Sequence, residues 1–237
     1  VITLFPISSS SFDRLLEFLP ILQPKSYPIS SNWNYHSSYI SIYITDSLPY
    51  NPILSQLLSI QKNSRTHPTV NVSLKYGTSL QLERLSQKNN VRPMLIITKG
   101  VSVAPFLGLL YETVTENLQT KAILLHCMNP NETKKNFVLR RSIRKLQKIG
   151  VLEKVHLVHP SQLNTILKET QATMWNYMND MNCICYIAGC NGNILTDIMK
   201  NISSMVETRC TPLVYRGNKE YAQAFIEQLR EAERFEE

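Results

Sequence analysis

The sequence has little glycine and little cysteine. Its 237 residues include 7 glycines and 5 cysteines, and no two cysteines form a Cys-x-x-Cys pair. So few glycines exclude collagen-like repeats, and an odd set of cysteines without that spacing argues against a disulfide framework and a zinc site. We therefore expect a reducing compartment, the cytoplasm, and no bound metal.

Long apolar runs are also missing. The apolar stretch at residues 101–111 holds a proline and is far shorter than the roughly 20 apolar residues that span a bilayer. The chain starts at Val1 without the basic start and apolar run of a signal peptide. We therefore expect no membrane span, and we expect this chain to be part of a longer protein.

Positive charge is concentrated in one segment. The net charge is +7, and lysines and arginines crowd the stretch between Glu132 and Glu153. Helical spacing separates apolar from basic side chains here, which predicts an amphipathic helix over about residues 133–147. The apolar face holds Leu139, Ile143 and Leu146, and the basic face holds Arg140, Arg144 and Lys148. The basic face is either a solvated surface or a docking surface for an acidic partner. Nucleic acid is not expected, because no aromatic side chains are interleaved with these charges.

The hydrophobic pattern changes near residue 92. Before it, β-forming runs at residues 26–30, 39–45 and 70–76 are separated by serine- and proline-rich segments, which predicts antiparallel strands. After it, apolar runs alternate with helical patterns, which predicts a parallel sheet with right-handed crossovers. The predicted strands are residues 94–98, 122–126, 155–158 and 185–188, and helices are expected after residues 103, 133, 162 and 193.

Parallel sheets of this kind bind ligands beyond the carboxyl ends of their strands. In this chain those ends are residues 98–102, 126–128, 159–162 and 189–193, so we expect these four loops to surround one crevice. Cys190 lies in the last of them. We expect it to be a small buried side chain rather than a nucleophile, because no histidine is near it in the sequence. The histidines at strand ends are expected to be structural.

Four segments, in order, resemble the ferredoxin-NADP reductase superfamily in its diflavin-reductase form. LPILQPKSYPISSN (residues 19–32) looks like its flavin-binding strand, and residues 52–55 occupy the place of a flavin-binding turn. MLIITKGVSVAPFLGLL (residues 94–110) is similar to its nucleotide loop and following helix. YIAGCNGNILTD (residues 186–197) is similar to its last strand and turn, and the chain ends on REAERFEE.

The resemblance implies a fold and an electron path. It implies a partial antiparallel β-barrel that binds FAD over residues 1–91, followed by a five-stranded, parallel, doubly wound NADP(H)-binding domain over residues 92–237. Electrons would pass from NADPH to FAD, then to an FMN domain that this chain lacks. The most similar branch is the NADPH-dependent diflavin oxidoreductases of cytosolic iron–sulfur assembly, whose acceptor is an anamorsin-type protein. Methionine synthase reductase, of the cytochrome P450 reductase superfamily, is close behind.

The same resemblance assigns flavin-binding residues. Lys25 would hold the FAD diphosphate, and Tyr27 would lie against the flavin ring as a stacking surface. Ser30, Ser31 and Ser55 would bind phosphate or ring oxygens. Pro28 stands where the family has serine, so one hydrogen bond toward the flavin is lost at this position. Alternatively, Tyr27 is an ordinary half-buried strand residue.

The nucleotide site is assigned to the crevice. Lys99, Gly100 and Ser102 would cradle a pyrophosphate at a helix N-terminus, where free amides favour anions. Gly189 and Asn191 would also bind NADP(H). Pro160-Ser161 takes the place of a Ser-Arg pair that grips the 2′-phosphate, which leaves Ser161, Gln162 and Lys168 as candidates. The arginine expected there is missing, and Met128 stands where another arginine is usual.

Two hypotheses follow from these residues, and no catalytic residue is identified. The first is an active NADPH-dependent flavoprotein oxidoreductase module. The second is a diverged module of the same fold that is catalytically weak or inactive and binds a protein partner. The preserved order of the four segments favours the first, and the substitutions at Pro28, Met128 and Ser161 favour the second.

Overall fold

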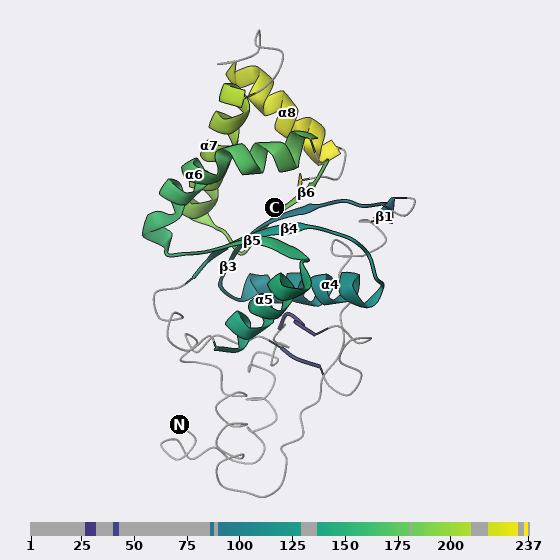
Figure 1. Ribbon diagram of the computed structural model, residues 1–237. Coiled ribbons are helices and arrows are strands. Elements are labelled where there is room, and N and C mark those ends of the chain that lie inside the picture. The colour runs from purple at the N-terminus through teal and green to yellow at the C-terminus, as the bar shows by residue number, and fades with distance from the viewer. Residues whose placement is uncertain are drawn as a thin grey trace, which may run out of the picture.

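The computed structural model of the protein describes residues 27–31, 40–42, 86–87, 90–128, 137–180, 182–209, 218–231 and 235–236. These residues form an α/β fold around a parallel sheet in the order β5-β4-β3-β6-β7. Figure 1 shows helices on both faces of this sheet. The predicted α/β class with a parallel, doubly wound sheet is therefore confirmed.

Three of the strands are apolar over nearly their whole length. β3 (Met94–Lys99), β4 (Ala122–Cys127) and β6 (Ile184–Ala188) are buried on both faces, as expected for central parallel strands covered by helices. β5 (Leu152–Val158) lies at one edge and alternates less regularly. A two-residue strand, β7 (Phe235–Glu236), pairs with β6 at the other edge.

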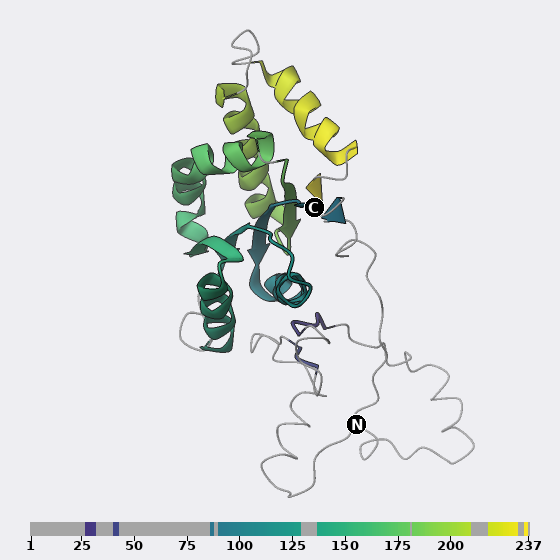
Figure 2. The ribbon, with the colours of Figure 1, turned by 45° about the vertical axis from the view of Figure 1, so that its right-hand side comes forward.

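The helices cover the two faces in pairs. α4 (Ala104–Thr115) and α5 (Phe137–Ile149) contact each other on one face, and α6 (Leu163–Trp175) and α7 (Gly192–Arg209) contact each other on the opposite face. α8 (Lys219–Glu231) packs on α7 (Figure 2). Shorter elements complete the described chain: β1 (Ser86–Gln87), β2 (Asn90–Val91), the 3-10 helices η2 (Gly100–Val103) and η3 (Pro160–Gln162), and the π-helical turn η4 (Asn176–Asp180).

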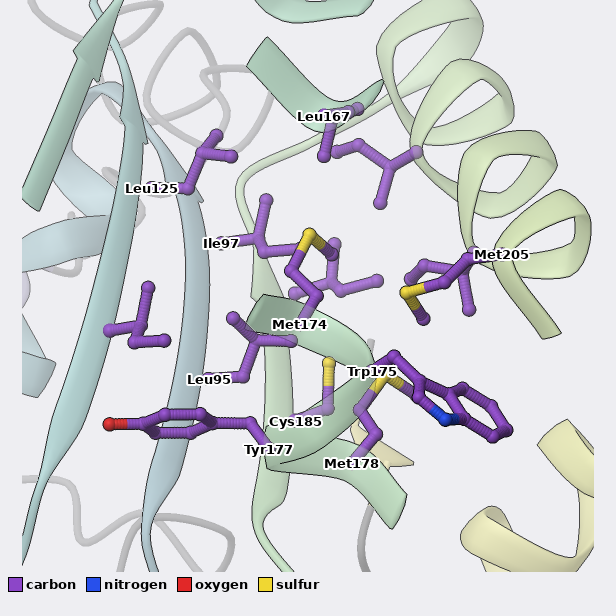
Figure 3. Close-up of a cluster of buried hydrophobic side chains, with 14 of the residues drawn as sticks. Leu95, Ile97, Leu125, Leu167, Met174, Trp175, Tyr177, Met178, Cys185 and Met205 are labelled. Carbon is purple, nitrogen blue, oxygen red and sulfur yellow. The ribbon is translucent and has the colours of Figure 1, made fainter. Parts of the chain in front are cut away.

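Two apolar cores follow from the alternation of side chains along the strands. Leu95 and Ile97 of β3 join the core under α6, α7 and α8, whereas Met94 and Ile96 join the core under α4 and α5. Figure 3 shows the first core, in which Met174 and the indole of Trp175 lie on the helix side of the sheet. The two cores hold the strands between two helical layers. Because the strands are parallel, their carboxyl ends lie together at one end of the sheet.

The predicted elements correspond closely to the observed ones after residue 92. The predicted strands match β3 to β6, and the predicted helices match α4 to α7 within a few residues. Neither α8 nor β7 was predicted. Before residue 92, a bridge joins Ile29 to Ile42 in antiparallel register, as the predicted strands require. The expected strand at residues 70–76 lies outside the described residues, and the FAD-binding barrel and the boundary at residue 91 stay predictions.

Candidate functional site

The order in which the chain adds strands to the sheet changes direction at β3, and we call this place the reversal point. Starting from β3, the chain adds β4 and β5 on one side and then returns to place β6 on the other side of β3. The loops that follow β3 and β6 therefore leave toward opposite faces, and the crevice between such loops is where open α/β sheets bind ligands. In register, Thr98 lies opposite His126 on one side and Ala188 on the other.

The loop after β3 forms the first wall of this crevice. Lys99 ends the strand in an extended conformation, and the buried Gly100 follows with φ of 58°. The chain then continues through η2 into α4, which has a proline in its first turn and no acidic residue there. Free backbone amides and the helix dipole at this end favour an anion. The predicted pyrophosphate residues thus lie at a helix start beside the reversal point.

The loop after β6 touches the loop after β3. Gly189 has φ of 71°, and a Cβ atom built on it would lie 2.7 Å from the carbonyl oxygen of Lys99 and 2.8 Å from Cβ of Ser102. The Ser102 hydroxyl would overlap the same atom. Both the left-handed backbone and this close approach require glycine. The structure therefore brings together three of the predicted nucleotide residues, while Asn191 is exposed nearby in the chain.

Cys190 follows this glycine and is partly buried. Its Sγ donates to the carbonyl oxygen of Ala188 at 3.7 Å. Burial, with a smaller contribution from Cys127, raises the pKa of Cys190 to about 11, and Lys99 opposes that rise. Since the thiolate is the reactive form of cysteine, a thiol with this pKa is a weak nucleophile at neutral pH. This supports the expectation that Cys190 is not catalytic.

His126 is the most buried ionisable group in the crevice wall. Its side chain is fully buried, and Nδ1 lies 3.1 Å from the hydroxyl oxygen of Thr98. Among the residues that the structure describes, no group forms a hydrogen bond with Nε2. Burial lowers the pKa of His126 to about 4, so the imidazole is neutral at pH 7. The expectation of a satisfied structural histidine is therefore only half correct, and the polar pair with Thr98 was not foreseen.

The loop after β5 holds the residues expected near a 2′-phosphate. His159 caps η3, and its Nδ1 accepts from the Ser161 amide and lies 2.8 Å from the Ser161 hydroxyl oxygen. Ser161 and Gln162 are both exposed. Met128 is 8% exposed, and its backbone amide donates to Val158, so its side chain is largely removed from the surface of the crevice.

A polar cluster joins the first turn of α6 to the second and third turns of α7. The Asn164 amide donates to the Asp197 carboxylate at 3.2 Å, and the Asn201 amide donates to the Asn164 side chain at 3.0 Å. Sequence reasoning missed this cluster, because Asn164 lies more than 30 residues before its two partners on α7 and no local pattern links them.

Three of the residues predicted to bind flavin, Tyr27, Ser30 and Ser31, lie on a small antiparallel pair of segments, residues 27–31 and 40–42, which we call the ribbon. The Ser30 amide donates to the Ser41 carbonyl oxygen at 2.8 Å, and the Ser30 hydroxyl reaches the same oxygen at 3.3 Å. The Ser31 hydroxyl oxygen accepts from the Ser41 amide at 2.9 Å. Both hydroxyls thus hold the ribbon together, and only the Ser31 hydroxyl hydrogen is left for another acceptor.

Tyr27 is half-buried at the start of the ribbon. Because side chains two residues apart in a strand point to one face, Tyr27 shares a face with Ile29, and Ile42 lies directly across from Ile29. Ile29 and Ile42 are 38% and 48% exposed, so this face offers apolar surface beside the tyrosine ring. Lys25 and Ser55 lie outside the described residues, and their assignment to flavin stays a prediction.

Two further observations concern the part of the chain that the structure describes. It contains no helix long and apolar enough to cross a membrane. Within the same residues, no group of three or more histidine, cysteine or acidic side chains comes together as a metal would require.

Comparison with known proteins gives one informative match. No model of a known protein family matches the chain. Over 237 aligned residues the chain is 22% identical to NADPH–cytochrome P450 reductase from Cavia porcellus, and the match covers 93% of the chain and 33% of that protein. The chain thus spans about a third of the length of this relative. The match supports a relationship to the diflavin reductase superfamily, and the α/β sheet is consistent with the NADP-binding domain of such proteins.

Proposed function

We propose that this chain is the FAD- and NADP(H)-binding reductase module of a diflavin reductase. In this proposal NADPH supplies a hydride to FAD, and single electrons continue to an FMN domain and then to a protein acceptor. The observation that carries the proposal is the contact between the loops after β3 and β6 at the reversal point of the sheet, where Gly189 meets Lys99 and Ser102. The match to a reductase over nearly the whole chain supports the same function.

The residues at the crevice fit a dinucleotide. A side chain at Gly189 would fill the space between the two loops, and Gly100 lets the backbone turn directly into η2. The Lys99 side chain adds positive charge beside the helix start, where a pyrophosphate would be held by backbone amides. His126 stays neutral behind this wall, so it adds no charge to the anion site at pH 7.

Recognition of a 2′-phosphate is the weaker part of the fit. The Ser161 hydroxyl is already paired with His159, and Met128 is largely buried. A phosphate is held best by a cation with forked donors, and arginine is absent from both positions. We therefore propose that the module accepts NADPH with little preference over NADH.

The partners in this proposal are acidic. Arg144 and Lys148 are exposed on α5, and Leu139, Ile143 and Leu146 beneath them are buried, as the amphipathic pattern predicted. Such a surface can steer an acidic FMN domain of the same longer chain, or an acidic acceptor such as an anamorsin-type protein, toward the flavin. A cytoplasmic location is part of the same proposal.

The alternative function is a partner-binding module of the same fold that transfers electrons weakly or not at all. The pairing of Ser30 and Ser31 with Ser41 favours it, because these hydroxyls then serve the ribbon rather than a cofactor. In that case the exposed basic face of α5 would carry the function, and the crevice would be a remnant of an ancestral nucleotide site.

The test is the absorbance spectrum of the purified full-length protein, followed by anaerobic addition of NADPH. Flavin absorbance bands at about 380 and 450 nm that disappear when NADPH is added would support the proposed reductase function. Tyr27→Ala should lower the FAD content, because it removes the stacking ring, and Tyr27→Phe should restore it. If NADPH does not reduce the flavin of the wild-type protein, the partner-binding alternative is favoured.

A further inference from the structure

α4 is buried on nearly every side, although a surface helix normally has one apolar stripe. Its buried residues include Phe106, Leu109 and Leu110, which face the sheet core, and also Gly108 and Thr113. A helix that is apolar all round is covered from more than one direction. In both ribbon views α4 lies between the sheet and the ribbon (Figures 1 and 2).

Gly108 is the point at which α4 meets the ribbon. A Cβ atom built on Gly108 would lie 3.5 Å from the carbonyl oxygen of Ser31 and 3.7 Å from that of Ile29. These distances are ordinary van der Waals contacts, so the methyl group of an alanine would fit against the ribbon. A longer side chain at Gly108 that points toward the ribbon would meet its backbone, because no further space is left in that direction.

The side of residues 27–31 that faces away from residues 40–42 lies against this glycine. The Ser30 amide donates across to Ser41, so the carbonyl groups of its two neighbours, Ile29 and Ser31, point away from the partner strand. Those are the two carbonyl oxygens nearest to Gly108. The contact is therefore between a strand edge and a helix backbone, and a larger side chain at Gly108 would push the whole edge outward.

We propose that Gly108 is a positioning residue that sets the distance between the flavin-side ribbon and the nucleotide loop. This inference rests on the proposed function. α4 carries the nucleotide loop η2 at its N-terminus and the ribbon near its second turn, and a helix is rigid over that length. Tyr27 lies only two residues before Ile29, so a shift of the ribbon edge moves the proposed stacking ring relative to the crevice.

Hydride transfer is sensitive to such a shift. The dihydronicotinamide is oxidised and the flavin is reduced as the hydride passes between them, and the reacting atoms must lie within about 3–3.5 Å. A misplacement of about 1 Å costs on the order of a hundredfold in rate. A variant with a side chain larger than a methyl group at Gly108 should therefore slow flavin reduction without removing a group that binds either cofactor.

The experiment compares Gly108→Ala, Gly108→Val and Gly108→Leu in the full-length protein. Stopped-flow flavin reduction by NADPH should stay close to the wild-type rate in Gly108→Ala, whose methyl group fits. It should slow in Gly108→Val and further in Gly108→Leu, reaching on the order of a hundredfold for leucine. The FAD content and the nucleotide dissociation constant should stay close to those of the wild type. Ala224→Leu, at an exposed position of α8, is the control for adding a bulky side chain to a helix. Equal reduction rates across an active series would overturn the inference.

A second measurement separates this inference from the proposed function. Hydrogen exchange of the Ser30 amide, which is bonded to Ser41, reports on the ribbon whether or not flavin is reduced. Faster exchange in Gly108→Leu but not in Ala224→Leu supports the contact, and unchanged exchange overturns it. A wild-type protein that shows no flavin reduction overturns the proposed function instead. Gly108→Val serves both measurements if the leucine variant fails to fold.

Discussion

The Ser102 hydroxyl occupies the space that any side chain on Gly189 would need. These two residues are 87 positions apart in the sequence and belong to the loops that follow β3 and β6, the two central strands between which the chain reverses its direction. The contact joins the two loops, and η2 begins directly beside it. Its geometry therefore decides whether the proposed nucleotide site keeps its shape.

Gly189→Ala should destabilise the protein more than Gly192→Ala. Both glycines have positive φ, 71° and 53°, so alanine at either position costs about 1–2 kcal/mol from the backbone alone. Within the described part of the chain, the new Cβ has close neighbours at Gly189 and no heavy atom within 4 Å at Gly192. Overpacking should add about 1–3 kcal/mol at Gly189.

Urea unfolding of both variants measures that difference. Adding Ser102→Ala to Gly189→Ala should restore part of the lost free energy of unfolding, because the hydroxyl is removed. The restoration should be incomplete, because the Lys99 carbonyl oxygen stays. Equal free energies of unfolding for Gly189→Ala and Gly192→Ala would contradict the observed contact.

The positions of the strands and of the crevice loops could be read from the sequence. Runs such as MLIIT and AILLH are apolar without alternation, which is typical of central parallel strands, and the helical patterns between them require crossovers. The order of such units places their carboxyl ends together. This is why the sequence predicts that Lys99, Ser102 and Gly189 lie close together, as they do; their role in nucleotide binding stays a prediction.

The contacts that shape the site could not be read in the same way. Gly108 looks like an ordinary helix residue until a ribbon some 80 residues earlier is packed on it, and the pairing of Ser30 and Ser31 with Ser41 depends on strand register. The absence of a partner on His126 Nε2 is equally invisible in a sequence. α8 is different, because Ala222, Ile226 and Leu229 follow a helical spacing and are buried, so a signal was present and was missed.

His126 should make the protein less stable at mildly acidic pH. Its pKa is lowered from 6.5 to about 4 by burial, so between these values the unfolded state binds a proton that the folded state does not. Stability is then fully present above pH 6.5 and is lost as the pH falls toward 4. From pH 7 to pH 5 this group alone should cost about 2 kcal/mol.

The loss of stability between pH 7 and pH 5 is measured from the midpoints of urea unfolding of the wild type and of His126→Gln. The variant should lose less stability on acidification, by about the same 2 kcal/mol, since glutamine does not titrate. His156→Gln is the comparison. The pKa of His156 is also lowered, first by burial and then by Lys154, but Glu169 opposes the shift and the side chain is only partly buried. An identical pH dependence in wild type and His126→Gln would show that His126 is not held neutral by burial.

Ser161→Arg should increase the preference for NADPH over NADH. Ser161 is exposed on the loop after β5, and the wild type presents no arginine there. A charge-assisted hydrogen bond is worth about 1.5–3 kcal/mol, which corresponds to roughly a tenfold to hundredfold change in the ratio of kcat/KM values. Thr165→Arg, at an exposed position one turn into α6, controls for added charge. A wild-type preference for NADPH of a hundredfold would contradict the assignment of this pocket.

The exposed basic face of α5 should govern electron transfer to the acceptor and not flavin reduction. Arg144 and Lys148 are exposed, and Arg140 precedes them at the same four-residue spacing. Reversing Arg144 and Lys148 to glutamate lowers the net charge from +7 to +3. It should not unfold the helix, because like charges four residues apart repel and the first reversal replaces one such pair with an attractive one.

A transient complex with an acidic partner is steered by charge and screened by salt, with a Debye length of about 8 Å at physiological ionic strength. The double reversal should therefore slow electron transfer to the acceptor at low salt and flatten its dependence on salt. Reversing Lys200 and Lys219 to glutamate gives the same net charge on the other side of the sheet, at exposed positions of α7 and α8. If the face of α5 is a docking surface, only the first double variant changes the rate to the acceptor, and both reduce flavin as the wild type does. If both double variants change that rate equally, the effect comes from net charge alone, and α5 is only a solvated surface.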